Sequence, residues 1–429
     1  KKTRRISGSS SKTDYFTQYI RVDDQPNFAA VVIIVANIFN ILFDYVFLSY
    51  FKWGIDSVSL ASFIGYAIAL AFCLWYVYNP KRTFRFVRCA LAIKTFFKTA
   101  GKIIKVGFPA ASLGFFQVVF FYMLNIFLVN SLGDIGLTTY MICVDALVIS
   151  SVVTVGVFET LTSIVPIYYA KHDYLNLNHL IKNSLLISLS FSALLTIFLL
   201  IWPEGFLALY NFNKIDNAGF IINALKLYSF YFIFLVLPSL LIFYYEGIER
   251  SVFSSLLSLL SELVAPLISI FLLYDLIGSD GIWLGFSLSS IITMIVIIVA
   301  VKLIQKREGE YEGLFFIEKD LINKTKNFVL TGNDIDMRGD CLNHLKNLNA
   351  GDEFCGNVSK LLDVIFDTND KDTYVEVLLI DYPDNIHVDI KYEGEKENFE
   401  QLKSNFPEDL FNYAEVLGFN TIEYSVDKT

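Results

Sequence analysis

Long apolar segments dominate the first three hundred residues of this 429-residue chain and stop near Lys306. A helix that crosses the hydrocarbon core of a bilayer needs ~20 consecutive, mostly apolar residues. Eight segments meet that requirement, and polar residues separate each of them from the next. The sequence therefore predicts a polytopic α-helical membrane bundle of about eight spans, at residues 27–51, 56–78, 103–130, 137–169, 181–203, 218–247, 252–274 and 281–304.

The composition changes where the last apolar segment ends. Hydrophobic residues make up 55% of the whole chain and charged residues only 18%, whereas soluble domains carry about 25% charge. From Lys306 to Thr429, by contrast, 27 Asp and Glu stand against 13 Lys and Arg. These residues are expected to form a separate, acidic, soluble domain. Such a surface argues against nucleic acid as a partner, because phosphate binding needs clustered Lys and Arg.

The basic residues between the apolar segments predict how the chain lies in the membrane. The loop at residues 81–102 is rich in Lys and Arg and contains no acidic residue, and loops of this kind stay in the cytoplasm. Six further crossings return the chain to the same side at residues 302–307, and the basic start at residues 1–5 also belongs there. We therefore predict a multi-pass protein of the plasma membrane with both termini in the cytoplasm.

The soluble tail shows the patterns of a small α/β domain. Some stretches carry apolar residues at helical spacing, and others alternate apolar and polar residues as strands do. Its cysteines belong to an odd total of five with no CxxC pair, so we expect neither a disulfide framework nor a metal site. We expect helices at residues 351–366 and near Leu410–Leu417, and strands at residues 374–382, 385–394 and 421–427.

Several segments of the apolar region carry recognisable motifs. Residues 19–65 follow the order R-x-D-x-x-P, N-I-x-x-D and W-G-I, carried by Arg21, Asp23, Pro26, Asn40, Asp44, Trp53 and Gly54. Further motifs are KVGFPA (105–110), GVFETLTSIVPIYYAKHD (156–173) and YEGIERSVFSSLLSLLSELVAPL (245–267). Over residues 19–305 the chain thus resembles the MATE family of multidrug and toxic compound exporters, from the fifth helix of that family onward.

The resemblance implies a domain organisation. Members of the family have twelve spans in two six-helix bundles, and this chain matches the last eight, so the first four are expected to be missing or to come from a second subunit. The expected parts are a basic N-terminal segment (1–26), two helices ending an N-terminal bundle (27–80), a basic cytoplasmic loop (81–102), a six-helix C-terminal bundle (103–305) and the acidic tail (306–429).

Ionisable residues inside spans are costly and are therefore candidates for cation coupling. Asp145 and Glu159 are fourteen residues apart, close to four helical turns, and so share one face of a helix. Glu262 lies in the middle of its span, four residues before Pro266, where a broken helix would offer a carboxylate and free carbonyls to a cation. Asp44 lies near a helix end, where contact with interfacial water is the simpler interpretation, and Asn40 is a candidate for interhelical packing or substrate contact.

These features imply a MATE-like exporter, not an enzyme, that works by alternating access. H⁺ or Na⁺ is the expected coupling ion, and small hydrophobic or cationic organic compounds are the expected substrates. One alternative is a flippase for lipid-linked saccharides, which would need Lys and Arg in its cavity. A second is a membrane-anchored protein that does not transport and presents the tail as a nucleotide sensor or interaction domain.

The tail in turn resembles the ATP-binding fold of histidine kinases and anti-sigma-factor kinases. That family has E-x-x-x-N on a helix, and Glu353 and Asn357 match it. It then has D-x-G after a strand, where the Asp binds adenine. Here Gly394 is present, but Tyr392 replaces the Asp, and the glycine-rich lid is absent from 395–409. The resemblance implies a degenerate nucleotide fold without catalysis, for which ATP and Mg²⁺ are doubtful ligands and regulation is the expected role.

Overall fold

The computed structural model describes residues 16, 20, 26–54, 56–78, 93–210, 217–322, 324–331, 335–348, 350–369, 373–382, 384–393, 411–416 and 419–427. The chain divides into two compact units, residues 1–100 and 101–429, and each is treated by itself. The N-terminal segment 1–26 lies almost entirely outside the described residues, as do residues 81–92 of the basic loop. Residues 93–102, expected to belong to that loop, instead form the first turns of helix α4 (Ile93–Leu132).

The first unit is an antiparallel pair of apolar helices. Helix α2 (Pro26–Tyr45) continues into a π-helical turn, η2 (Val46–Tyr50), and α3 (Asp56–Val77) runs back against it. The chain reverses at Lys52 and Gly54, both with positive φ. Small residues allow close packing, since a Cβ on Gly65 would lie 2.8 Å from the Ala36 carbonyl oxygen.

Six apolar helices of membrane-spanning length make up most of the second unit, so the chain has eight among its described residues, as the sequence predicts. Helix α8 lies at the centre and packs against α5, α6 and α11. Gly133 and Gly278, both with positive φ, end α4 and α10. The elements are α4 (Ile93–Leu132), α5 (Asp134–Ala170), α6 (Tyr174–Ile201), α7 (Pro203–Leu207), η3 (Ala208–Tyr210), α8 (Ala218–Gly247), α9 (Ser251–Leu259), η5 (Leu260–Val264), α10 (Ala265–Ile277) and α11 (Ser279–Glu308).

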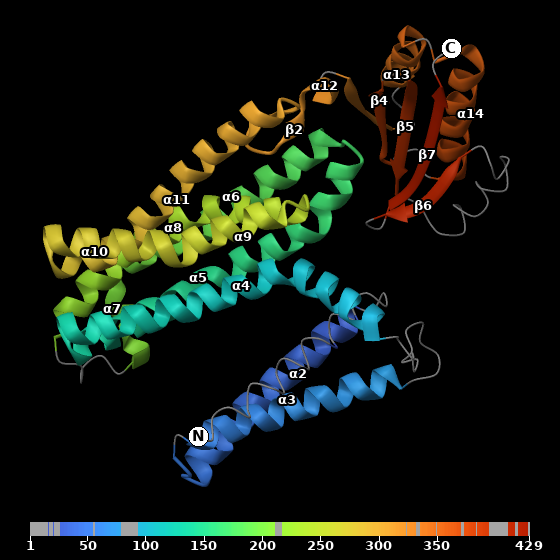
Figure 1. Ribbon diagram of the computed structural model, residues 1–429. Helices are drawn as coiled ribbons and strands as arrows, with labels where there is room; N and C mark the ends of the chain where they lie inside the picture. Colours follow the sequence, from blue (N-terminus) through green and yellow to red (C-terminus); the bar gives the residue numbers. More distant parts are fainter. Residues whose placement is uncertain are drawn as a thin grey trace. The chain divides into compact units, whose positions relative to one another are not determined.

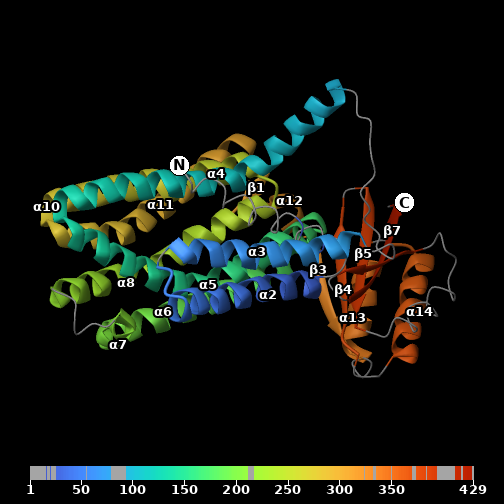
Figure 2. The ribbon, with the colours of Figure 1, turned by 90° about the horizontal axis from the view of Figure 1, so that it is seen from below.

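The tail begins with a small hairpin, continues into an antiparallel five-stranded sheet of order β3-β4-β5-β7-β6, and has α13 and α14 packed on one face of that sheet. Figure 1 and Figure 2 both show α14 on the side of the sheet away from α5 and α6. The elements are β1 (Tyr311–Glu312), β2 (Ile317–Glu318), α12 (Lys319–Ile322), β3 (Thr325–Leu330), α13 (Ile335–Asn347), α14 (Asp352–Thr368), β4 (Val375–Asp381), β5 (Asn385–Tyr392), β6 (Asn412–Val416) and β7 (Phe419–Asp427).

One element of the tail differs from the sequence prediction. The helix expected near Leu410–Leu417 is wrong, because residues Asn412–Val416 form strand β6. Tyr413 pairs with Ile422 and Val416 with Phe419 in a tight antiparallel hairpin. Five residues are too few for helical periodicity to be decisive, and the hydrogen bonds offered by the neighbouring strand decide the conformation.

Candidate functional site

The membrane helix that contains Glu262 changes its geometry at that residue. Regular α-helix α9 ends at Leu259, a π-helical turn covers Leu260–Val264, and α10 begins with Pro266 in its first turn. Proline has no N–H to donate to the preceding turn, which favours a wider turn just before it. Single π-turns inside helices are frequent at functional sites. The disruption expected from the sequence thus takes the form of a wide turn that carries the carboxylate.

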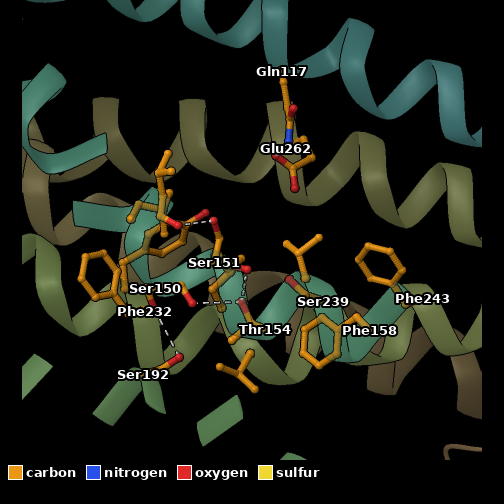
Figure 3. A pocket seen from close by; sticks show the side chains of 16 residues that line it. Gln117, Ser150, Ser151, Thr154, Phe158, Ser192, Phe232, Ser239, Phe243 and Glu262 are labelled. Atoms are coloured by element: carbon orange, nitrogen blue, oxygen red, sulfur yellow. Dashed lines mark hydrogen bonds between the residues drawn. The ribbon is translucent and has the colours of Figure 1, made fainter. Parts of the chain in front are cut away.

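Glu262 lines a cavity of about 350 Å³ within the second unit. Its side chain points toward Gln117 of α4, whose amide Nε2 donates a hydrogen bond to the carboxylate Oε2 at 3.2 Å (Figure 3). Five helices supply the walls, which combine hydroxyl groups with aromatic rings. The lining residues are Gln117, Leu147, Val148, Ser150, Ser151, Thr154, Val155, Phe158, Ser192, Tyr231, Phe232, Leu235, Val236, Ser239, Phe243 and Glu262.

Half of the hydroxyl groups of the cavity, those of Ser150, Ser151 and Thr154, come from α5. Ser150 Oγ lies 3.4 Å from Ser192 Oγ on α6, and Thr154 donates a hydrogen bond to the carbonyl of Ser150. On the described lining there is one carboxylate and no Lys or Arg. Such a set of oxygen atoms can hold a proton or coordinate a hard cation such as Na⁺, and the apolar walls suit an organic compound.

Asp145 and Glu159, the other coupling candidates of the second unit, are not among the residues that line this cavity. Asp145 accepts a hydrogen bond from the Tyr210 hydroxyl at 2.5 Å, and Glu159 is exposed on α5. In the first unit, the Asn40 amide of α2 donates a hydrogen bond to Ser62 Oγ of α3 at 2.9 Å. This contact is of the interhelical packing kind. The buried Oδ1 atom of Asp44 has no hydrogen-bond partner among the described residues.

Sequence reasoning missed the residues that line the cavity together with Glu262. Gln117 is 145 residues away in the chain, and Tyr231 and Ser192 belong to two further helices. The available signal for Gln117 was an amide inside an apolar segment, the same kind of signal that drew attention to Asn40. No local spacing links Gln117 to Glu262, because their contact depends on how α4 packs against the helix that carries the π-turn.

In the tail, the residues of the degenerate nucleotide motif have other contacts. Glu353 is exposed, and the Asn357 amide donates to the Tyr424 hydroxyl of β7 at 3.3 Å. Tyr392 is fully buried in the core under α13 and α14, and burial raises the pKa of its hydroxyl. Gly394 lies outside the described residues. At the motif position of the adenine-binding Asp, the chain thus has a buried hydroxyl group in place of a carboxylate.

No protein-family model and no curated protein matches the chain. Solved structures do. An inward-facing multidrug resistance MATE family transporter of the MOP superfamily matches with a TM-score of 0.60 and 15% identity, over 70% of this chain and 69% of that one. A MATE in complex with MaL6 matches with a TM-score of 0.59 and 15% identity, over 68% of this chain.

A MOP superfamily transporter from Pyrococcus furiosus, described as having a binding pocket of reverse polarity that suggests a different function, matches with a TM-score of 0.57 and 16% identity, over 68% of this chain and 65% of that one. The chain spans 65% of the length of the MATE bound to MaL6. At these identities the likeness concerns the fold. The apolar helices of this chain therefore have the membrane fold of the MATE transporters.

Proposed function

We propose that this chain is the membrane part of a cation-coupled transporter that exports small hydrophobic or cationic organic compounds by alternating access. The observation that carries the proposal is Glu262, an acid on a π-turn in the middle of a membrane helix, facing a cavity with aromatic and hydroxyl walls. An intramembrane carboxylate is retained at a considerable energetic cost, which favours a role in moving ions.

The coupling step follows from the chemistry of the site. A charged Glu262 attracts a proton, Na⁺ or a cationic substrate, and a neutral Glu262 does not, so occupancy by one cation weakens the binding of another. The Gln117 amide donates a hydrogen bond to the carboxylate at 3.2 Å and so gives it a polar partner inside the bundle. The transporter alternates between an inward-facing and an outward-facing state. A cation that binds one of these states more tightly than the other shifts the equilibrium toward the state it prefers.

A saccharide flippase is less well supported by the same cavity. Pyrophosphate-linked lipids are bound by Arg and Lys, which form bidentate or multiple hydrogen bonds with phosphate. The described lining has neither and carries an acid instead, so anionic head groups would be repelled. We further propose that the tail lies in the cytoplasm of a cell whose plasma membrane holds the bundle.

Transport by the full chain reconstituted into liposomes tests the proposal. We expect a fluorescent lipophilic cation to move against its own gradient when a pH gradient or a Na⁺ gradient is imposed, and not when both are dissipated by an ionophore. Imposing the two gradients separately identifies the coupling ion. Uptake equal to that of protein-free liposomes under both gradients would contradict the proposal.

The tail offers a second, independent prediction. Because Tyr392 is buried where the resemblance requires an Asp, we expect ATP with Mg²⁺ at millimolar concentration to leave the melting temperature of the full chain unchanged. A ligand at 100 times its Kd stabilises the native state by about 2.7 kcal/mol, so binding would be readily seen. An ATP-dependent rise that is lost in Asn357→Ala would instead favour the nucleotide-sensing alternative.

A further inference from the structure

The polar face of the tail sheet is buried, although its sequence has the alternation of a half-solvated sheet. In β5, Ile386, Val388 and Ile390 point into the core under α13 and α14, and the intervening residues occupy the opposite face. On that opposite face Asp389 is 1% exposed and Lys391 8%. Buried charged residues need partners, and these partners come from the membrane bundle.

The partners are residues of the α5–α6 turn, Lys171–Asn176. Lys171 Nζ lies 3.0 Å from an Asp389 carboxylate oxygen and 2.8 Å from one of Glu423 in β7. In the opposite sense, Lys391 of β5 forms an ion pair with the fully buried Asp173. Each side of the contact therefore supplies both a cation and an anion, a complementary pattern that fixes one orientation.

The turn and the sheet also share a polar cluster. Asp173 accepts a hydrogen bond from the Asn176 backbone N–H at 3.3 Å and so caps α6. The Asn176 amide also donates to Glu376 of β4. Burial lowers the pKa of Lys391, but the carboxylates of Asp173, Glu376 and Asp389 together more than offset this and leave that pKa raised. Asp173 thus caps the N-terminus of α6 and, together with Asn176, binds the sheet.

A second contact lies at the hairpin that precedes the sheet. The hydroxyls of Tyr245, Tyr244 and Tyr169 donate to three consecutive backbone carbonyls, those of Leu314, Phe315 and Phe316, at 2.9, 2.8 and 2.7 Å. Phe316 is fully buried, and the Arg250 guanidinium lies 3.9 Å from the centre of its ring. Tyr169 belongs to α5, and Tyr244 and Tyr245 belong to α8. The β1–β2 hairpin at the start of the tail is therefore hydrogen-bonded to two helices of the bundle.

We infer that the polar face of the tail sheet, formed by Glu376, Asp389, Lys391 and Glu423, is a docking surface for the α5–α6 turn of this chain. This docking and the contact at the hairpin together hold the tail and the six-helix bundle in one fixed arrangement. A ligand or partner that binds the tail then acts on the bundle through this turn. The inference does not depend on transport activity, because it concerns the contact and not the cavity.

Amide hydrogen exchange of the full-length protein in detergent tests the docking. In Lys391→Met the buried Asp173 loses its cation, and we expect exchange in peptides covering residues 171–177 to rise about tenfold, since an unpaired buried charge is strongly unfavourable. In Lys391→Met combined with Asp173→Asn the unpaired charge at position 173 is gone and only the longer contact of Lys391 with Glu376, at 3.9 Å, is lost. Exchange should therefore fall back toward that of the original protein. Asn at position 173 keeps a cap for α6.

The matched control is Asp363→Asn, which breaks the ion pair with Arg338 on the helix-covered side of the tail and should leave residues 171–177 unchanged. Glu423→Gln is a second, milder variant for the case that Lys391→Met fails to fold, because Glu423 is 32% exposed; a smaller rise in the same peptides is expected. The inference is overturned if exchange at 171–177 is unchanged in both variants, or if the double variant exchanges faster than Lys391→Met.

Discussion

Replacing Glu262 by Gln is expected to abolish cation-driven transport while leaving the protein folded. Gln has nearly the same shape as Glu and can still hydrogen-bond to Gln117 across the 3.2 Å contact, but it cannot lose a proton or carry a negative charge. Without a change of charge, the cavity has no means of exchanging a coupling cation for a substrate. We expect gradient-driven uptake to fall by at least about tenfold, the effect of losing an interaction to a charged group.

The matched control is Glu159→Gln on α5. Glu159 is exposed and does not line the cavity, so the same chemical change there should leave uptake within about twofold, as expected for substitutions away from buried features. Unchanged melting temperatures in both variants would show that folding is not the cause. Equal loss of uptake in the two variants would remove Glu262 from its proposed role, and full uptake in Glu262→Gln would do so directly.

Gly281→Val is expected to destabilise the membrane bundle strongly. Gly281 lies in the first turn of α11, where a Cβ would fall 2.1 Å from the Leu273 carbonyl oxygen of α10. That neighbour is backbone and cannot rotate away, so the two helices must separate. Overpacking typically costs about 1–3 kcal/mol, and a clash with rigid backbone lies at the upper end of that range. Separation also exposes the fully buried Trp283.

Gly219→Val is the matched control for this substitution, because Gly219 lies in the first turn of α8 and a Cβ there meets nothing within 4 Å. We expect Gly219→Val to give the usual yield of monodisperse protein and an unchanged melting temperature, and Gly281→Val to give aggregated protein or a melting temperature lower by several degrees. Equal behaviour of the two variants would contradict the close approach of α10 and α11.

The spans could be predicted from the sequence because the signal is local and strong. About twenty apolar residues in a row have few alternatives to a membrane helix, and all eight were confirmed. Strands β4, β5 and β7 were also predictable, because alternating patterns of seven to nine residues specify which side chains face a core. Strand β6 was not, since five residues leave the choice between helix and strand to the pairing with β7.

The candidate site could be predicted only in part. Glu262 was found from the sequence, because an acid four residues before a proline in an apolar run is unusual whatever surrounds it. Its selection over Glu159 and Asp145 required the structure, which places Glu262 on a cavity wall, Glu159 on the surface, and Asp145 against Tyr210. The sequence does not show which of the three faces a cavity, since burial depends on which helices pack against each face.

The long apolar segments thus by themselves determined that the chain is a membrane bundle with a soluble tail, since transfer of apolar surface out of water depends on composition and length. Only the tertiary structure decided that Gln117 faces Glu262, and that the polar side of β5 is an interface instead of a wetted surface. The physical reason is the same in both cases. A charge in the sequence shows that a partner is needed, but the partner is supplied by residues far along the chain, and only packing brings them within hydrogen-bonding distance.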